Sequence, residues 1–125
     1  MSTYQPAACN ISRRGRVRRL AVAVVAFAVA VAYVGAVAVD LLPEPLLVGA
    51  FVPLAVGFEW GFQAATSFCV RLALANRYDF RPDGGAAGAV TDPDHRRADH
   101  EYAAKLTVAA CALAGASTVL VWVLL

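Results

Sequence analysis

The chain has 125 residues, of which 60% are hydrophobic and 16% are charged. An average soluble domain has about 45–50% apolar and about 25% charged residues, so this composition excludes an ordinary soluble domain. The net charge at pH 7 is only +2, and we predict no nucleic-acid partner. The composition indicates instead a membrane protein, with the lipid bilayer as its predicted partner.

Three apolar runs are each long enough to cross a membrane, which takes about 20 helical residues for about 30 Å of hydrocarbon. The runs Leu20–Val39, Leu46–Val70 and Leu106–Leu125 contain no Lys, Arg or Asp and only one Glu. Only helices and closed barrels satisfy their backbone polar groups in lipid, and three segments are too few for a barrel. We therefore predict an all-α integral membrane protein, a bundle of three transmembrane helices.

In chain order, turn and cap residues divide these helices. Pro43 and Pro45 predict a tight hairpin of helices one and two, and Pro53 predicts a kink in helix two. Asp92 before Pro93 is an N-cap candidate for a helix that begins in water. The first 12 residues show no periodicity, and we expect them to be mobile. The predicted segments are a basic N-terminal tail (1–19), transmembrane helix 1 (20–39), an outer turn (40–45), transmembrane helix 2 with a cytoplasmic extension (46–75), a cytoplasmic loop that is helical from about 93 (76–102), and transmembrane helix 3 (103–125).

The basic residues all fall on one side of this predicted topology. Six lie between helices two and three, and the outer turn holds only acids. The positive-inside rule places the N-terminus and the loop in the cytoplasm and the C-terminus outside, in a multi-pass protein of the plasma membrane. The N-terminal arginines, which we expect at the anionic membrane surface, are Arg13, Arg14, Arg16, Arg18 and Arg19.

The same arginines admit a second interpretation. The stretch SRRGRV at residues 12–17 resembles part of a twin-arginine export signal, and residues 36–38 form an A-x-A site after the apolar run. Cleavage there would remove helix one and leave the orientation of the other two helices unchanged.

Glu59 is the one Asp, Glu, Lys or Arg inside the three runs. An acid at the centre of a membrane helix costs about 2.5–3.5 kcal/mol, so its side chain should face protein or a water-filled cavity. Two polar residues share its helical face, and counting 1.5 Å per residue along the other helices places three more at its depth. The predicted polar cluster consists of Glu59, Gln63, Thr66, Tyr33, Ser117 and Thr118.

Three roles are open for this cluster. Hydrogen bonds between helices can specify how the helices pack. A carboxyl group in a membrane can instead carry protons or cations, or it can meet a basic residue of a partner protein.

Small residues at four-residue spacing let helices approach closely, and two helices carry such rows. We expect them to seat helix two against helix three, or one copy of the chain against another. The predicted packing residues are Gly57, Gly61 and Ala65 on helix two, and Cys111 with Gly115 and Ala112 with Ala116 on helix three.

No catalytic constellation is visible, and we predict no enzyme activity, no metal and no cofactor. His95 and His100 are five residues apart and do not share a helical face, which argues against a metal pair. We predict a structural, assembly or accessory subunit that acts through helix–helix association, as a homo-oligomer or in a larger membrane complex. The alternatives are a small homo-oligomeric protein that moves protons or ions by means of Glu59, and a holin-like pore former.

Overall fold

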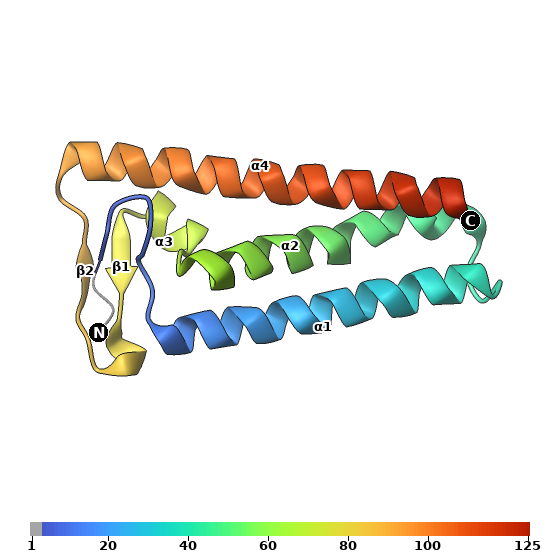
Figure 1. Ribbon diagram of the computed structural model, residues 1–125, viewed down its shortest axis with the longest axis horizontal. Helices are drawn as coiled ribbons and strands as arrows, with labels where there is room; N and C mark the ends of the chain where they lie inside the picture. The colour runs from blue at the N-terminus through green and yellow to red at the C-terminus, as the bar shows by residue number, and fades with distance from the viewer. Residues whose placement is uncertain (1–3) are drawn as a thin grey trace.

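The computed structural model describes residues 4–125, with the side chain of Asp83 excepted. Three long helices run side by side. Residues 4–12, before the first of these helices, and the chain between the second and the third form a small cap at one end (Figure 1). The elements in order are α1 (Arg13–Ala38), η1 (Glu44–Ala50), α2 (Phe51–Thr66), α3 (Val70–Leu74), β1 (Arg77–Asp79), η2 (Arg81–Asp83), β2 (Ala87–Ala89) and α4 (Pro93–Leu124).

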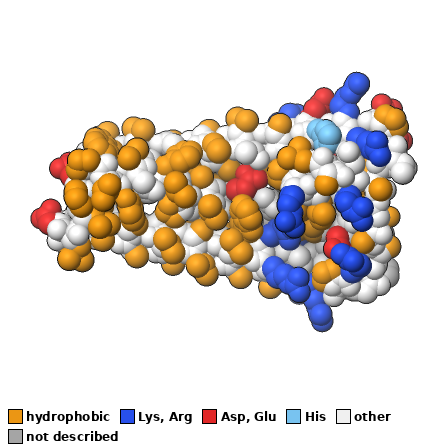
Figure 2. Space-filling model, turned by 180° about the vertical axis from the view of Figure 1, so that it is seen from behind, with side chains coloured by type: hydrophobic (Ala, Val, Ile, Leu, Met, Phe, Trp, Pro, Cys, Tyr) orange, Lys and Arg blue, Asp and Glu red, His pale blue; other side chains and the backbone are white. Residues whose placement is uncertain are grey.

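Three helical segments are long and apolar enough to cross a membrane, namely Arg13–Ala38, Glu44–Thr66 and Pro93–Leu124. This confirms the prediction of a mostly helical chain with three such helices; their insertion and orientation stay predictions. Only about a fifth of the most apolar window of each segment (22%, 17% and 22%) is buried within the chain. Most residues of these apolar windows are therefore exposed or only partly buried by the rest of the chain. Figure 2 shows an apolar surface along the shaft, with Lys and Arg side chains gathered at the cap end.

Helix α1 begins at Arg13, before the apolar run that starts at Leu20, so the N-terminal arginines belong to the helix. Ser12 is the N-cap, and its hydroxyl accepts a hydrogen bond from Gly15 N at 3.2 Å. One face of α1 is buried and carries alanines, which lets α2 approach closely. The buried alanines of this face are Ala23, Ala26 and Ala30.

The second predicted helix does not continue to residue 75, and that prediction is wrong. Helix α2 ends at Thr66, Ser67 adopts a left-handed conformation (φ 56°), and the chain restarts as the short helix α3. The break places Phe68, which is 0% exposed, in a core with Ala73 and Leu106. Burial of an aromatic side chain outweighs a continuous helix here.

Pro53 lies just after the point where the second span changes its helix type, and a kink there stays a prediction. The span starts as the 3₁₀ helix η1, and the α-helical part begins only at Phe51. Pro53 therefore lies in the first turn of α2, where the backbone N–H that proline lacks is not needed.

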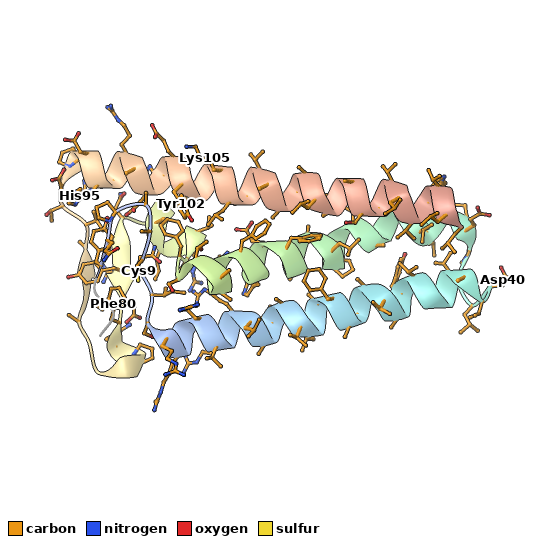
Figure 3. The ribbon with its side chains drawn as sticks, viewed as in Figure 1. Cys9, Asp40, Phe80, His95, Tyr102 and Lys105 are labelled. Atoms are coloured by element: carbon orange, nitrogen blue, oxygen red, sulfur yellow. The ribbon has the colours of Figure 1, made fainter. Side chains whose placement is uncertain are left out.

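Residues 10–12 of the N-terminal tail, which we expected to be mobile, are buried in the cap. Asn10 and Ser12 are 0% exposed, and Ile11 is 3% exposed. Residues 4–12, which we call the strap, cross the end of the bundle. Figure 3 shows Cys9 of the strap at the same end as Phe80 and His95, far from Asp40 at the outer turn.

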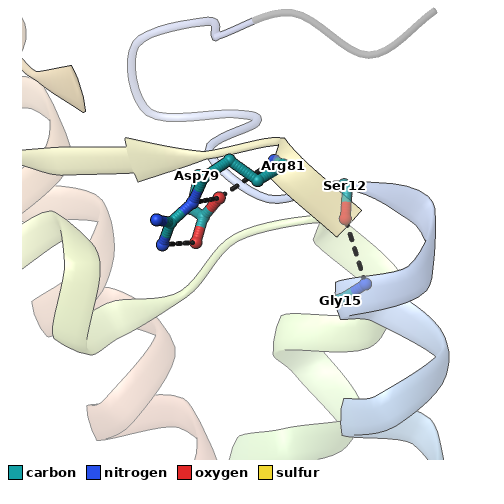
Figure 4. A network of polar contacts seen from close by, with 4 residues as sticks. All are labelled: Ser12, Gly15, Asp79 and Arg81. Atoms are coloured by element: carbon teal, nitrogen blue, oxygen red, sulfur yellow. Dashed lines mark hydrogen bonds and ion pairs between the residues drawn. The ribbon is translucent and has the colours of Figure 1, made fainter. Parts of the chain in front are cut away.

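The predicted flexible loop contains an antiparallel hairpin that sequence patterns did not indicate. Strands β1 and β2 pair with Arg77 opposite Ala89, and η2 lies between them. Asp79 and Arg81 form an ion pair at 2.9 Å beside the Ser12 cap of α1 (Figure 4). The predicted start of α4 is confirmed, because Pro93 is its first residue and Asp92 accepts from Asp94 N at 2.8 Å.

Candidate functional site

A chain of hydrogen bonds crosses the three long helices near the cap. Arg19 Nε of α1 donates to Gln63 Oε1 at 3.1 Å, and Gln63 Nε2 donates to Glu59 Oε1 at 3.1 Å. Thr107 Oγ1 of α4 donates to the same Glu59 oxygen at 3.2 Å. Gln63, at 4% exposure, is the buried link of this chain. We call these four residues the polar chain; it fixes how α1, α2 and α4 lie against one another.

The structure brings together two of the six residues of the predicted cluster, Glu59 and Gln63. The other hydroxyl groups bond to backbone carbonyls: Thr66 to Phe62 O at 2.6 Å and Thr118 to Ala114 O at 2.7 Å. Tyr33 OH donates to the carbonyl of Leu46, which ties α1 to η1 at the outer end. Ser117 is half-buried on α4.

The error arose from the depth assigned to Glu59. The prediction took Val70, the last residue of the second apolar run, as the inner end of the second helix. Helix α2 instead ends at Thr66, seven residues after Glu59. Glu59 is therefore about 10 Å from the end of α2, at 1.5 Å per residue, and lies in the half of the bundle near the cap. Arg19 and Thr107, the other members of the polar chain, accordingly lie near the cap. Both residues stand at the predicted inner ends of their helices, which was the one indication of these partners in the sequence.

The small-residue row of α2 packs on α1 and not on α4. A Cβ on Gly57 would lie 2.8 Å from Cε1 of Phe27, and one on Gly61 would lie 3.8 Å from Cβ of Ala23. Ala65, the third residue of the predicted row, is exposed. Two glycines thus let α1 and α2 approach closely.

On α4 the predicted rows do not make the internal contact. Cys111, Ala112 and Ala116 are exposed, and Gly115 meets only the edge of Phe51 at 4.0 Å. The alanines that α4 buries lie on another face, namely Ala103, Ala110 and Ala114.

A cavity of about 530 Å³ opens beside the polar chain, between α1, α2 and α3. Its basic wall holds Arg18, Arg19 and Arg71. Its apolar wall includes Val22, Trp60 and Leu74, and Glu59 and Gln63 also line it. Trp60 of α2 thus borders this cavity.

The other three arginines of the predicted basic group do not line the cavity. Arg13 and Arg14 line a separate hollow over η2. Arg16 Nε donates to the carbonyl of Ala64 at 2.8 Å, which holds the start of α1 on α2.

The strap is fastened to α4 by Asp99, which is 0% exposed. Tyr4 OH donates to Asp99 Oδ2 at 2.7 Å, and Ala7 N donates to Oδ1 at 2.8 Å. Burial, followed by the hydrogen bond to Asp99, raises the pKa of the Tyr4 phenol. Asp99, which lies next to His100 in the sequence, thus anchors the strap. Among residues 4–125 no group of three or more His, Cys, Asp or Glu side chains is placed to hold a metal.

Comparison with known protein families, curated proteins and solved structures gives no significant match. The class of this protein is therefore defined by its own features. It is a mostly helical chain with three helices long and apolar enough to span a membrane.

Proposed function

We propose that this chain is a small multi-pass membrane protein that works by assembling, with a second copy of itself or within a larger membrane complex. We place the contact on the outward face of α1. The observation that carries the proposal is Gly35, an exposed glycine of α1 with nothing within 4 Å of the position its Cβ would take.

Gly35 is unlike the other glycines of the three long apolar segments. The Cβ positions of Gly49 and Gly57 would meet Tyr33 at 2.7 Å and Phe27 at 2.8 Å, and those of Gly61 and Gly115 also meet a neighbour within 4 Å. A glycine inside a helix costs about 1 kcal/mol relative to alanine. Close approach within the chain accounts for that cost at Gly49 and Gly57, where a methyl group would clash, and a second molecule would account for it at Gly35.

Gly35 ends a regular row on α1. The row alternates valine with alanine or glycine at spacings of four and three residues, the seam of a coiled coil. All its members are exposed. They are Val17, Ala21, Val24, Ala28, Val31 and Gly35. The face that α1 packs on α2 also carries small residues, Ala23, Ala26 and Ala30, and small residues let helices approach closely.

The experiment compares two variants in which leucine replaces an alanine. Energy transfer between copies that carry donor and acceptor fluorophores measures their association in vesicles. Ala28→Leu places a bulky side chain on the row, and we expect association to weaken about tenfold, for a loss of about 1–2 kcal/mol in helix packing. Ala112→Leu makes the same change on the exposed face of α4 and should leave energy transfer unchanged. Equal energy transfer in both variants and the native chain would contradict the proposed face.

Ion or proton movement by means of Glu59 is the alternative, and it rests on Glu59 lining the cavity. Two donors already occupy one oxygen of this carboxyl group, an arrangement that suits a structural acceptor. In reconstituted vesicles Glu59→Gln should leave proton flux unchanged under the assembly proposal, because glutamine still accepts both hydrogen bonds. Loss of a measurable flux in that variant would favour the alternative.

A further inference from the structure

The three arginines of the cavity carry more charge than the chain neutralises. Among residues 4–125 the side chains of Arg18 and Arg71 have no hydrogen-bond or ion-pair partner, although both residues line the cavity. Arg19 uses Nε on Gln63 and Nη1 on the carbonyl of Gly15, which are both uncharged acceptors. Glu59 is the one acid in the wall, so the formal charge of the lining is +2 (three Arg, one Glu).

The other wall of the cavity is apolar. Trp60 of α2 and Val22 of α1 extend it toward the shaft, and Leu74 of α3 is 57% exposed beside it. The cavity is therefore amphipathic, with guanidinium groups at one side and hydrocarbon at the other. It lies where the Lys and Arg side chains meet the apolar surface of the shaft (Figure 2).

This arrangement selects a ligand with a phosphate group joined to hydrocarbon. Guanidinium groups bind phosphate oxygens by paired N–H donors, and basic pockets between membrane helices suit anionic headgroups. A soluble phosphate would satisfy the arginines but would leave Val22, Trp60 and Leu74 without a partner. An acyl chain covers such a wall in the bilayer.

We propose that the cavity binds an anionic glycerophospholipid of the cap-side leaflet. Arg18, Arg19 and Arg71 hold the phosphate, and an acyl chain lies along Val22, Trp60 and Leu74. Because α1 and α3 supply different arginines, the bound lipid would join them and fix the cap against the membrane surface. The inference rests on the membrane placement of the helices and not on their association through Gly35.

Trp60 offers a direct probe, because the chain has only two tryptophans and Trp122→Phe leaves Trp60 as the only indole. The protein is reconstituted in phosphatidylcholine vesicles that contain a small fraction of brominated phosphatidylglycerol or brominated phosphatidylcholine. We expect brominated phosphatidylglycerol to quench Trp60 at a mole fraction about tenfold lower than brominated phosphatidylcholine needs for the same quenching. Arg18→Gln and Arg71→Gln should each reduce this preference about fivefold.

The control is Arg14→Gln, which removes the same charge from α1 outside the cavity and should change the preference less than about twofold. Equal losses in Arg14→Gln and Arg71→Gln, or no preference in the native chain, would overturn the site. Release of quenching by inorganic phosphate at constant ionic strength would overturn lipid as the occupant. The same measurement on Ala28→Leu separates the two proposals, because this variant should lose association and keep the full lipid preference. A native chain that associates but shows no lipid preference overturns the lipid site alone.

Discussion

The side chain of Asn10 makes two hydrogen bonds to the backbone of Cys69. Asn10 Oδ1 accepts from Cys69 N at 2.7 Å, and Asn10 Nδ2 donates to Cys69 O at 3.1 Å. The backbone N–H groups of Asn10 and Ile11 both donate to Ser67 O. The strap therefore supplies the bonds that a continuous helix would have supplied, and this is why the second span can end at Thr66.

Asn10→Ala should open this break. Loss of both bonds leaves the buried N–H of Cys69 without an acceptor, at a cost of about 1–3 kcal/mol, while the Cys69 carbonyl keeps its bond from Ala73 N at 3.0 Å. In a Cys9→Ser, Cys111→Ser background, Cys69 is the only thiol, and it is 3% exposed. We expect maleimide to label it at least about tenfold faster in the variant. Gln5→Ala, at an exposed position of the strap, is the control, and equal rates in both variants would show that Asn10 does not hold the break.

The polar chain predicts a ranking of variants at Gln63 and Glu59. Gln63→Leu removes the link between Arg19 and Glu59, and Glu59→Leu removes the acceptor of Gln63 and Thr107, so each should destabilise the bundle by about 1–2 kcal/mol. Glu59→Gln keeps an acceptor oxygen and should cost less than about 0.6 kcal/mol. Unfolding midpoints in one detergent measure the order. A Glu59→Gln protein as unstable as Glu59→Leu would mean that the charge itself, and not the acceptor, is required.

The strap contact predicts a response to alkaline pH. The folded protein raises the pKa of Tyr4 by burial and by the bond to Asp99, so folding favours the neutral phenol. The stabilising effect is complete below the unfolded pKa of about 10 and is lost as the pH rises above it. Subtracting the phenolate absorbance of Tyr4→Phe from that of the native chain isolates Tyr4. The difference should show a tyrosine that ionises at higher pH than an ordinary one. In Asp99→Asn this difference curve should move toward lower pH, and an unchanged curve would exclude Asp99 as a cause.

The sequence predicted the features that depend on local chemistry. Length and apolarity identified the three long helices, and the N-cap Asp92 with Pro93 identified the start of α4 to the residue. It could not predict the break at Ser67, because the residues after it continue the apolar pattern. The side chain that bonds the backbone at the break is Asn10, 59 positions before Cys69, in a strap whose composition is that of a mobile tail.

The polar site was predicted in part for the same reason. Gln63 was found because it shares a helical face with Glu59, a relationship within one helix. Thr107 and Arg19 were missed because depth across helices depends on where each helix ends. The apolar wall and Arg71 of the cavity come together only because α3 turns back from α2, which no periodicity indicates.

The two glycines of α2 should respond in opposite ways to alanine. Gly61→Ala places a methyl group at ordinary contact distance from Ala23, and the gain in helix propensity, at most about 1 kcal/mol, should leave the bundle unchanged or more stable. Gly57→Ala drives a methyl group into the ring of Phe27, which packs edge-on against Phe58 with centroids 5.1 Å apart. The ring must move, so we expect a loss of about 1–3 kcal/mol. Unfolding in detergent measures both changes, and Phe27→Leu in the Gly57→Ala chain should recover part of the loss by making room. If the two alanine variants were equally stable, α1 and α2 would not approach each other as closely as the structure places them.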